Sequence, residues 1–374
     1  MSGTLSEHHS YLSIPGRHEA YRTAVAQVVQ PGDLVADLGC GFGVLGLLCL
    51  EAGADHVWGI DSTDAIEIAA ETMAREGMAD RYTCIRETSF RAELPEKVDV
   101  LICDHVGYFG VDYGIVAMLE DARSRFLKPG GRVIPQALDL RIAGVSSPQA
   151  RDVLGQWEKD TIPGAYSWLS DYCINSKHDV TLAAEELATR SVSLGKVDLT
   201  QDSPGMLSFT ARLTAGMDHD LDARGGWFSC ELAPGVTMTN APDAVDRITR
   251  GQVLLGFETP LAVMAGDSVE VTIKVRHEDG IISWIARNPR TGQQERQSTF
   301  ASLPMGAAPR SAPSQDTLSL NKAGLARTAV LALVDGKRSG EQIESEMLRS
   351  HSGLFPSQAE LVRFVRAELA RSTR

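Results

Sequence analysis

Residues 103–114 gather side chains that can exchange protons, in the order Cys-Asp-His-Val-Gly-Tyr-Phe-Gly-Val-Asp-Tyr-Gly. Carboxylates, and a histidine with an ordinary pKa of about 6.5, can take a proton from a reacting group. The apolar residues 98–103 directly before them predict a buried strand. Ligands of open α/β sheets bind beyond the carboxyl ends of the strands, so this segment is a candidate active site. Its candidate catalytic residues are Asp104, His105, Tyr108, Asp112 and Tyr113.

A glycine-rich turn is a second candidate site. It follows an apolar run at residues 34–36 that predicts a strand, and it precedes residues 44–50, which predict an apolar helix. Three glycines at alternate positions let the backbone turn tightly and approach a ligand. Asp61, at the tip of the next predicted strand, is placed to accept the hydroxyls of a ribose. The turn itself contributes Asp37, Gly39, Gly41 and Gly43.

The spacing of these glycines distinguishes between cofactors. A dinucleotide fingerprint needs G-x-G-x-x-G, whereas this turn is Asp-x-Gly-x-Gly-x-Gly. The alternative is a glycine-rich turn in some other doubly wound domain. The pattern resembles motif I of the class I methyltransferases, whose cofactor is S-adenosylmethionine and whose product is S-adenosylhomocysteine. That resemblance implies that the glycine turn lies under the methionine part and that Asp61 holds the ribose.

The elements around both sites alternate between helix and strand, which predicts a parallel sheet of Rossmann type over residues 33–136. Helices are expected at residues 62–76 and 115–127. Strands are expected at residues 82–85 and 132–135, the latter after a Lys-Pro-Gly-Gly turn. Thr88 and Ser89, just beyond the strand at residues 82–85, are expected to border the adenine.

The first 32 residues resemble the N-terminal cofactor lid of the protein arginine methyltransferases. His8, Tyr11-Leu12, Arg17 and Tyr21 match positions that recur in that lid, and a helix is expected from Arg17 to Pro31. The resemblance implies that Arg17 pairs with the carboxylate of the cofactor. The family's preceding helix is expected to be almost absent. The predicted cofactor residues are His8, Arg17, Asp37, Gly39, Gly41, Gly43, Asp61, Ser62, Thr88 and Ser89.

Residues 103–114 resemble the loop in which the same family clamps a guanidinium between two glutamates. Asp104 takes the place of the first glutamate and Tyr113 that of the second, with Asp112 one place earlier. His105 replaces a tryptophan, and it either takes a proton or packs under the loop. These changes favour an acceptor other than arginine, because a bidentate site loses discrimination when one partner is missing.

Residues 137–302 resemble the family's β-barrel domain. Residues 150–190 are expected to form its helical dimerisation arm, with Trp157 and Trp168 as apolar anchors. The family's Thr-His-Trp loop is missing, and Ile248-Thr249-Arg250 stands near its place.

Residues 303–316 are a linker by composition, and residues 317–374 predict three short helices. Capping boxes are expected at Ser339 and Ser357. The helices resemble PqqD-like winged-helix modules, which bind leader peptides in ribosomal peptide pathways; alternatively they pack on the barrel or on a second subunit. Their expected core comprises Leu331, Leu333, Ile343, Met347, Leu348, Leu361, Phe364 and Val365.

Composition limits the partners. The net charge of −13 argues against nucleic acid, although residues 321–374 carry +3. No apolar run approaches the roughly 20 residues that span a bilayer, and the start has no signal-peptide pattern, so no membrane is expected. Six scattered cysteines without a C-x-x-C pair suggest a reducing cytoplasm and no metal site.

These patterns together predict an α/β methyltransferase domain followed by a β-barrel and a helical module. The expected reaction is methyl transfer from S-adenosylmethionine to an amine nitrogen of a peptide, such as a ribosomal natural product, or of a small molecule. Two alternatives stay open: methylation of arginine in a protein or as the free amino acid, and a non-catalytic scaffold subunit. A homodimer through the helical arm is expected.

Overall fold

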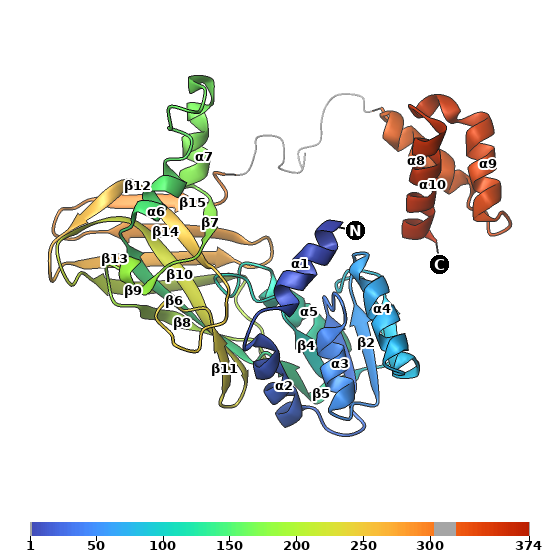
Figure 1. Ribbon diagram of the computed structural model, residues 1–374, viewed down its shortest axis with the longest axis horizontal. Helices are drawn as coiled ribbons and strands as arrows, with labels where there is room; N and C mark the ends of the chain where they lie inside the picture. The colour runs from blue at the N-terminus through green and yellow to red at the C-terminus, as the bar shows by residue number, and fades with distance from the viewer. Residues whose placement is uncertain (1, 303–318, 374) are drawn as a thin grey trace. The chain divides into compact units, whose positions relative to one another are not determined.

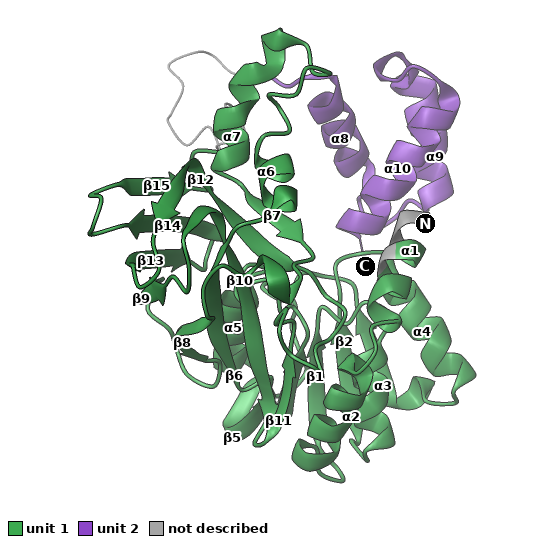
Figure 2. Ribbon diagram, turned by 60° about the vertical axis from the view of Figure 1, so that its left-hand side comes forward, with its two compact units in different colours: residues 1–304 green, residues 305–374 purple. Residues whose placement is uncertain are grey.

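The computed structural model describes residues 2–302 and 319–373. The chain forms two compact units, residues 1–304 and 305–374, which Figure 2 colours separately. The predicted linker, residues 303–316, lies outside the described residues.

A five-stranded parallel sheet forms the first half of the larger unit (Figure 1). Its core is apolar on both faces, as the continuous hydrophobic runs of its strands require. The register pairs Leu38 with Cys103, so the residues that follow β1 and β4 emerge side by side. This juxtaposition brings the glycine turn to the proton-exchanging loop. The strands, in sheet order, are β3 (Tyr82–Ile85), β2 (His56–Ile60), β1 (Leu34–Leu38), β4 (Val98–Cys103) and β5 (Leu127–Ile134).

The elements of this half follow the predicted order, with three differences. A helix, α1, is present where almost none was expected, and the ring of its His8 stacks on Phe42 at 4.1 Å between ring centres. Helix α4 begins three residues late, because the N–H and hydroxyl of Thr63 donate to Asp61 and form a turn. The expected Lys-Pro-Gly-Gly turn lies inside β5. The helices are α1 (Ser2–Leu12), α2 (Arg17–Val28), α3 (Val44–Glu51), α4 (Ala65–Arg75) and α5 (Ile115–Phe126), with the 3-10 turn η1 (Ala79–Arg81).

Two antiparallel sheets build a barrel-like second half. One has the order β7-β12-β10-β6-β8 with β11 on β10, and the other β15-β14-β13-β9. Trp227 and Trp284 are fully buried, and the indole N–H of Trp284 donates to the Gly256 carbonyl at 3.0 Å, which ties the sheets together. The strands are β6 (Ala137–Val145), β7 (Lys177–Val180), β8 (Val192–Asp198), β9 (Met206–Thr214), β10 (His219–Ala233), β11 (Val236–Thr239), β12 (Gln252–Val263), β13 (Ser268–Arg276), β14 (Ile281–Arg287) and β15 (Gln294–Ser298).

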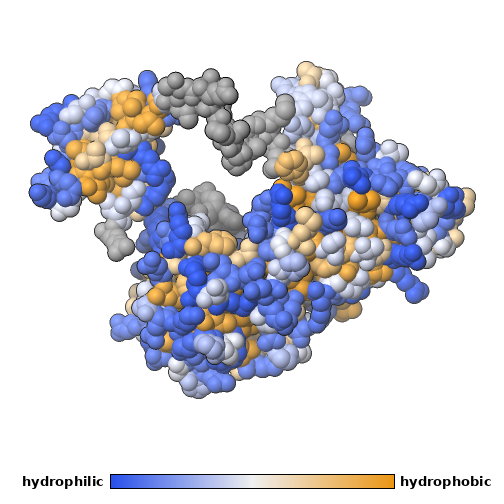
Figure 3. Space-filling view, turned by 180° about the vertical axis from the view of Figure 1, so that it is seen from behind, coloured by the Kyte–Doolittle hydropathy of each residue, from blue (hydrophilic) through white to orange (hydrophobic). Residues whose placement is uncertain are grey.

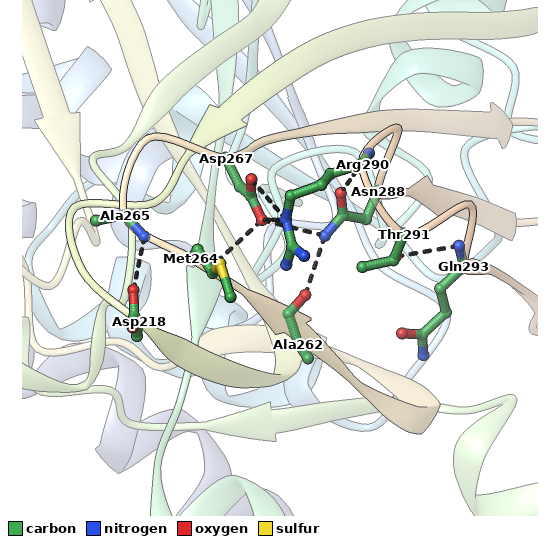
Figure 4. A network of polar contacts seen from close by, with 9 residues as sticks. All are labelled: Asp218, Ala262, Met264, Ala265, Asp267, Asn288, Arg290, Thr291 and Gln293. Atoms are coloured by element: carbon green, nitrogen blue, oxygen red, sulfur yellow. Dashed lines mark hydrogen bonds and ion pairs between the residues drawn. The ribbon is translucent and has the colours of Figure 1, made fainter.

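A polar network closes the turns at one edge of this barrel (Figure 4). Asp267 accepts from the Met264 N–H at 2.9 Å and from Arg290 Nε at 2.7 Å. Asn288 donates to the Ala262 carbonyl at 3.0 Å. These bonds hold the β12–β13 turn against the β14–β15 turn, so the network is structural.

The insert after β6 is helical over a shorter stretch than expected. Its helices are α6 (Pro148–Leu154), the 3-10 helix η2 (Gly164–Leu169) and α7 (Ser170–Ile174). Helix was predicted up to residue 190. Instead residues 177–180 pair with β12 as β7, because tertiary pairing overrides local helical preference, and a 3-10 turn, η3 (Ala184–Glu186), follows. Trp168 is 57% exposed on the surface of this insert, while Trp157 is half-buried.

The smaller unit consists of three helices in its described part, α8 (Lys322–Leu333), α9 (Gly340–Ser350) and α10 (Gln358–Ser372), with the 3-10 turn η4 (Ser352–Leu354). Ser339 and Gln342 form the predicted capping box. At Ser357 the side chain accepts from the Glu360 N–H, but the reciprocal half of the box is not formed within the described residues. Leu331, expected in the core, is 40% exposed. The buried core comprises Val330, Ile343, Met347, Leu361 and Val365, flanked by partly buried Leu333, Leu348 and Phe364.

Candidate active site

A cavity of about 310 Å³ lies in the larger unit, where α1, α2, the glycine turn, the loop after β4 and the barrel meet. Several predicted site residues line it: His8, Arg17, Asp37, Gly39, Gly41, Asp61, Asp104, His105 and Tyr113. Others stand outside this lining: Gly43, Ser62, Thr88, Ser89, Tyr108 and Asp112. The cavity therefore joins the two candidate sites that the sequence separates by more than 60 residues.

The glycine turn allows close approach from both sides. Gly39 has φ of +65°, and a Cβ there would lie 1.9 Å from the ring of His105. Gly41 has φ of +53°, and a Cβ there would lie 2.5 Å from the ring of His8. Only glycine meets both the backbone and the space requirement at these positions.

Asp61 braces the turn as well as facing the cavity. Its Oδ2 accepts from the Gly41 N–H at 2.9 Å, and its Oδ1 accepts from the Thr63 N–H at 2.8 Å and from the Thr63 hydroxyl at 2.6 Å. The carboxylate is thus held in a fixed orientation at the tip of β2.

Asp37 is completely buried at the end of β1. Its Oδ2 accepts from the Gly46 N–H at 2.9 Å, whereas its Oδ1 has no hydrogen-bond partner in the described chain. Burial raises the pKa of this carboxyl to about 7, against the opposing effect of the Gly46 N–H. A buried, unpartnered oxygen at the cavity is a ready acceptor for a ligand donor.

Arg17 and Asp104 form a buried ion pair. Arg17 Nε donates to Asp104 Oδ2 at 2.6 Å, and Nη2 donates to the same oxygen. The Tyr21 hydroxyl donates to Asp104 Oδ1 at 2.8 Å. Burial opposes the charge on Arg17, but Asp104 outweighs it and raises the pKa of the guanidinium. Two residues to which the sequence assigns separate roles, one toward the cofactor and one toward the acceptor, therefore contact each other.

His105 lies over Gly39 with its Nδ1 3.8 Å from the Cys103 sulfur. Burial lowers the pKa of the imidazole, although Asp104 and Asp61 partly oppose this. The ring is therefore neutral near neutral pH and can accept a proton. Both alternatives raised for this residue, packing and proton transfer, are compatible with its position.

Asp112 lies outside the cavity lining. Its Oδ1 accepts from the Phe109 N–H at 2.9 Å, and its Oδ2 pairs with Lys177 at 2.6 Å. A Cβ on Gly107 would lie 1.8 Å from Asp112, which explains the glycine there. The carboxylate, 1% exposed, is already neutralised by a cation from β7.

The barrel supplies site residues that sequence reasoning missed. Asn240 donates to the carbonyls of Tyr108 at 2.9 Å and Gly251 at 2.6 Å, and so holds the loop after β4 against the barrel. Arg250 lines the cavity together with Tyr11. Arg250 could have been predicted as a site residue from its position near the missing Thr-His-Trp loop, whereas no sequence motif marks Asn240 or Lys177.

Over the described ranges, no group of three or more His, Cys, Asp or Glu side chains is arranged to hold a metal ion. No helix among the described residues combines the length and apolar character that crossing a bilayer requires.

Comparisons with known proteins bear on this geometry. The family model for ribosomal protein L11 methyltransferase (PrmA) matches residues 16–158. Probable protein arginine N-methyltransferase 6 of Arabidopsis thaliana is 33% identical over 143 residues, 38% of this chain and 33% of that protein. Its Danio rerio counterpart is 32% identical over 178 residues, 45% and 50% of the two chains. The matches thus span a third of the length of the Arabidopsis thaliana protein and half of the length of the Danio rerio protein.

Longer matches have lower identity. Protein arginine N-methyltransferase 1 of Saccharomyces cerevisiae is 28% identical over 273 residues, 70% of this chain and 78% of that protein. The Trypanosoma brucei PRMT1 enzyme-prozyme complex with AdoHcy has TM-score 0.66 at 21% identity, over 75% of this chain and 93% of that chain. Arabidopsis thaliana protein arginine methyltransferase 10 has TM-score 0.65 at 22% identity, over 77% and 96%. These findings indicate an S-adenosylmethionine-dependent methyltransferase.

Proposed function

We propose that this chain transfers a methyl group from S-adenosylmethionine to an amine nitrogen of a peptide or a small molecule. The choice of an amine as acceptor rests on Asp112 and Tyr113, neither of which offers a free carboxylate to the cavity. Asp112 is buried against Lys177, and Tyr113 stands where a second glutamate would be needed. A guanidinium clamp needs two free carboxylates, and Asp104 is the one carboxylate of residues 103–114 that lines the cavity.

The lining fits the proposed cofactor in three respects. Gly39 and Gly41 let the rings of His105 and His8 pack closely against the turn, where both rings border a ligand in the cavity. The buried Oδ1 of Asp37 can accept from an ammonium group. Arg17 uses Nε and Nη2 toward Asp104, and among the described residues its Nη1 has no such partner, so it can donate to a carboxylate. When bound, S-adenosylmethionine supplies an electrophilic methyl group.

The residues of this chain then orient the acceptor and move one proton. Orientation of the reacting atoms supplies much of the acceleration in such a transfer. Asp104 or His105 receives the proton that the acceptor nitrogen loses, since both line the cavity and Asp104 is held by Arg17 and Tyr21. Tyr113 borders the acceptor from the cavity lining, and the ring of Tyr108 packs 5.8 Å from that of Tyr113.

Methylation of arginine is the second candidate, because the relatives named above are arginine N-methyltransferases. A matched pair of acetylated peptides separates the two. One carries arginine, and the other carries ornithine, a primary amine, at the same position. With labelled S-adenosylmethionine we expect transfer to ornithine to exceed transfer to arginine by roughly 10-fold or more. Robust labelling of the arginine peptide alone would contradict the amine proposal.

We further propose that the helical unit recruits a peptide acceptor, as a leader-peptide-binding module would. Apolar side chains lie exposed on this unit (Figure 3), among them Leu325 at 46% and Leu331 on α8. Ending the chain at residue 302 should raise KM for a peptide acceptor sharply while S-adenosylhomocysteine binding, measured by calorimetry, stays unchanged. An unaltered KM would reject this role for the unit.

We also propose an isologous homodimer through the insert that contains α6 and α7. Tyr166 and Trp168 are both more than half exposed there, which is unusual for large aromatic side chains. Light scattering at micromolar concentration should give twice the chain mass, and Trp168→Ala should shift the population toward monomer. Met217→Ala, which removes an equally exposed side chain between β9 and β10, is the control. A monomeric wild-type mass would overturn the proposal.

A further inference from the structure

Arg250 presents a buried guanidinium to the cavity without a hydrogen-bonded counter-ion. The residue is 9% exposed and lies two positions before β12. Its Nε and Nη1 have no hydrogen-bond partner anywhere in residues 2–302 or 319–373. Arginine is seldom buried unless it is paired, because desolvation of the charge is costly. An arginine in this state beside a binding cavity points to a ligand that completes its pairing.

Three tyrosine rings surround this guanidinium. The Cζ of Arg250 lies 5.6 Å from the ring centre of Tyr11, 5.2 Å from that of Tyr108 and 5.7 Å from that of Tyr113. Such cation–π contacts stabilise the charge through the ring faces, but they leave Nε and Nη1 in the guanidinium plane without acceptors. Arg250 is buried among these rings, and an ion pair formed at a buried site is stronger than one formed in water.

The acids of the site do not supply the missing partner. Asp104 is bonded to Arg17 and Tyr21, and Asp112 to Lys177 and the Phe109 N–H. Asp179 on β7 is exposed and acts on Arg250 only through space, because no ion pair joins the two within the described part of the chain. Arg250 therefore has no hydrogen-bonded anionic partner at the acceptor end of the cavity, and a second cation such as a substrate guanidinium would meet its charge there.

We infer that Arg250 binds a carboxylate carried by the methyl acceptor, so that the substrate class is an amine that also bears a carboxylate. The planar guanidinium offers two parallel N–H donors, and a carboxylate accepts both. This inference rests on the proposed N-methyl transfer, since it names the class of acceptor for the same cavity. It assigns the amine to the Asp104 side and the carboxylate to the Arg250 side.

Dipeptides with a free α-amine, each prepared as the free acid and as the C-terminal carboxamide, test this assignment. Binding to protein saturated with S-adenosylhomocysteine is measured by calorimetry, and methyl transfer is measured separately with labelled cofactor. We expect the acid form to bind at least about 10-fold more tightly than its amide in wild type, the scale of one charge-assisted pair. Arg250→Gln should remove this preference, and Arg250→Lys should keep part of it.

Arg247→Gln is the matched control, because Arg247 is exposed and donates to the Pro242 carbonyl at 2.7 Å outside the cavity lining. It should leave the acid preference intact. Affinity for S-adenosylhomocysteine should be unchanged in Arg250→Gln; a large loss there instead would make Arg250 a cofactor ligand and overturn the inference. Equal behaviour of acid and amide forms in wild type, including no binding of either, would also overturn it.

The two measurements separate this inference from the function on which it rests. A clear acid preference in binding without any methylated amine would support Arg250 as a carboxylate site and reject amine N-methylation. Methylation of amides and acids at equal rates would support the function and reject the role of Arg250. The wild-type comparison decides the point even where a variant fails to fold.

Discussion

Asp104→Asn is expected to lower kcat for methyl transfer by about 10²–10⁴-fold, the usual contribution of a positioned acid or base. Asp104 lines the cavity at the end of β4, and its carboxylate is fixed by Arg17 and Tyr21. The amide keeps the shape of the side chain but cannot take a proton. Rates are measured in single turnover with the best amine of the peptide panel, so that product release does not mask the chemical step.

The same substitution removes the counter-charge of Arg17, whose side chain is 9% exposed. Removing one partner of a buried ion pair lowers the free energy of unfolding by about 3–5 kcal/mol. The variant should therefore also unfold at a lower denaturant concentration. Activity is therefore compared under conditions where circular dichroism shows both proteins folded.

Asp99→Asn is the matched control for Asp104→Asn. Asp99 lies on β4, which ends one residue before Asp104, and pairs with Lys128 at 2.8 Å, away from the cavity lining. Losing that partly exposed pair should cost stability but leave kcat unchanged. If folded Asp104→Asn retained full activity, Asp104 would be excluded as the base and His105 would be the remaining candidate in this loop.

The parts of the site predicted from sequence are those whose chemistry is local. The glycine turn follows a short apolar run, and residues 39 and 41 have the positive φ that their glycines suggest. Asp61 stands at the tip of β2 as expected, because a five-residue buried strand leaves little choice of end point. Local pattern suffices where neighbours in sequence are also neighbours in space.

The missed parts involve residues distant in sequence. Arg17 and Asp104 lie 87 positions apart, and their pairing depends on how α2 crosses the end of β4. Lys177 reaches Asp112 over 65 positions from a strand that was predicted to be helix. A four-residue strand such as β7 carries too few residues for a period-2 pattern to compete with the helical pattern before it.

The charge balance of the acceptor end was likewise beyond sequence reasoning. The substitutions of the two glutamate positions predicted a weaker guanidinium site, but not that Lys177 and Arg250 would bring positive charge into the same region. Both cations come from the barrel. Asn240, which donates to the Tyr108 carbonyl, holds the same loop against the barrel.

Asp61→Ala is expected to weaken S-adenosylmethionine binding by about 1.5–3 kcal/mol, the worth of charge-assisted hydrogen bonds to the ribose. This corresponds to roughly 10–150-fold in Kd by calorimetry. Asp64→Ala is the control, since Asp64 lies three residues away, is exposed and pairs with Arg86 outside the cavity. It should leave Kd unchanged.

The bonds from Asp61 to Gly41 and Thr63 add a second cause that the experiment must separate. Alanine at this position also removes the brace of the glycine turn, which would weaken binding of any ligand seated there. S-adenosylhomocysteine and its 2′,3′-dideoxy analogue are therefore both titrated against wild type and Asp61→Ala. If Asp61 holds the ribose hydroxyls, the substitution costs affinity for S-adenosylhomocysteine but little for the analogue. Equal losses for the two ligands would mean that Asp61 acts only by bracing the turn, and unchanged affinity for both would move the nucleoside away from β2.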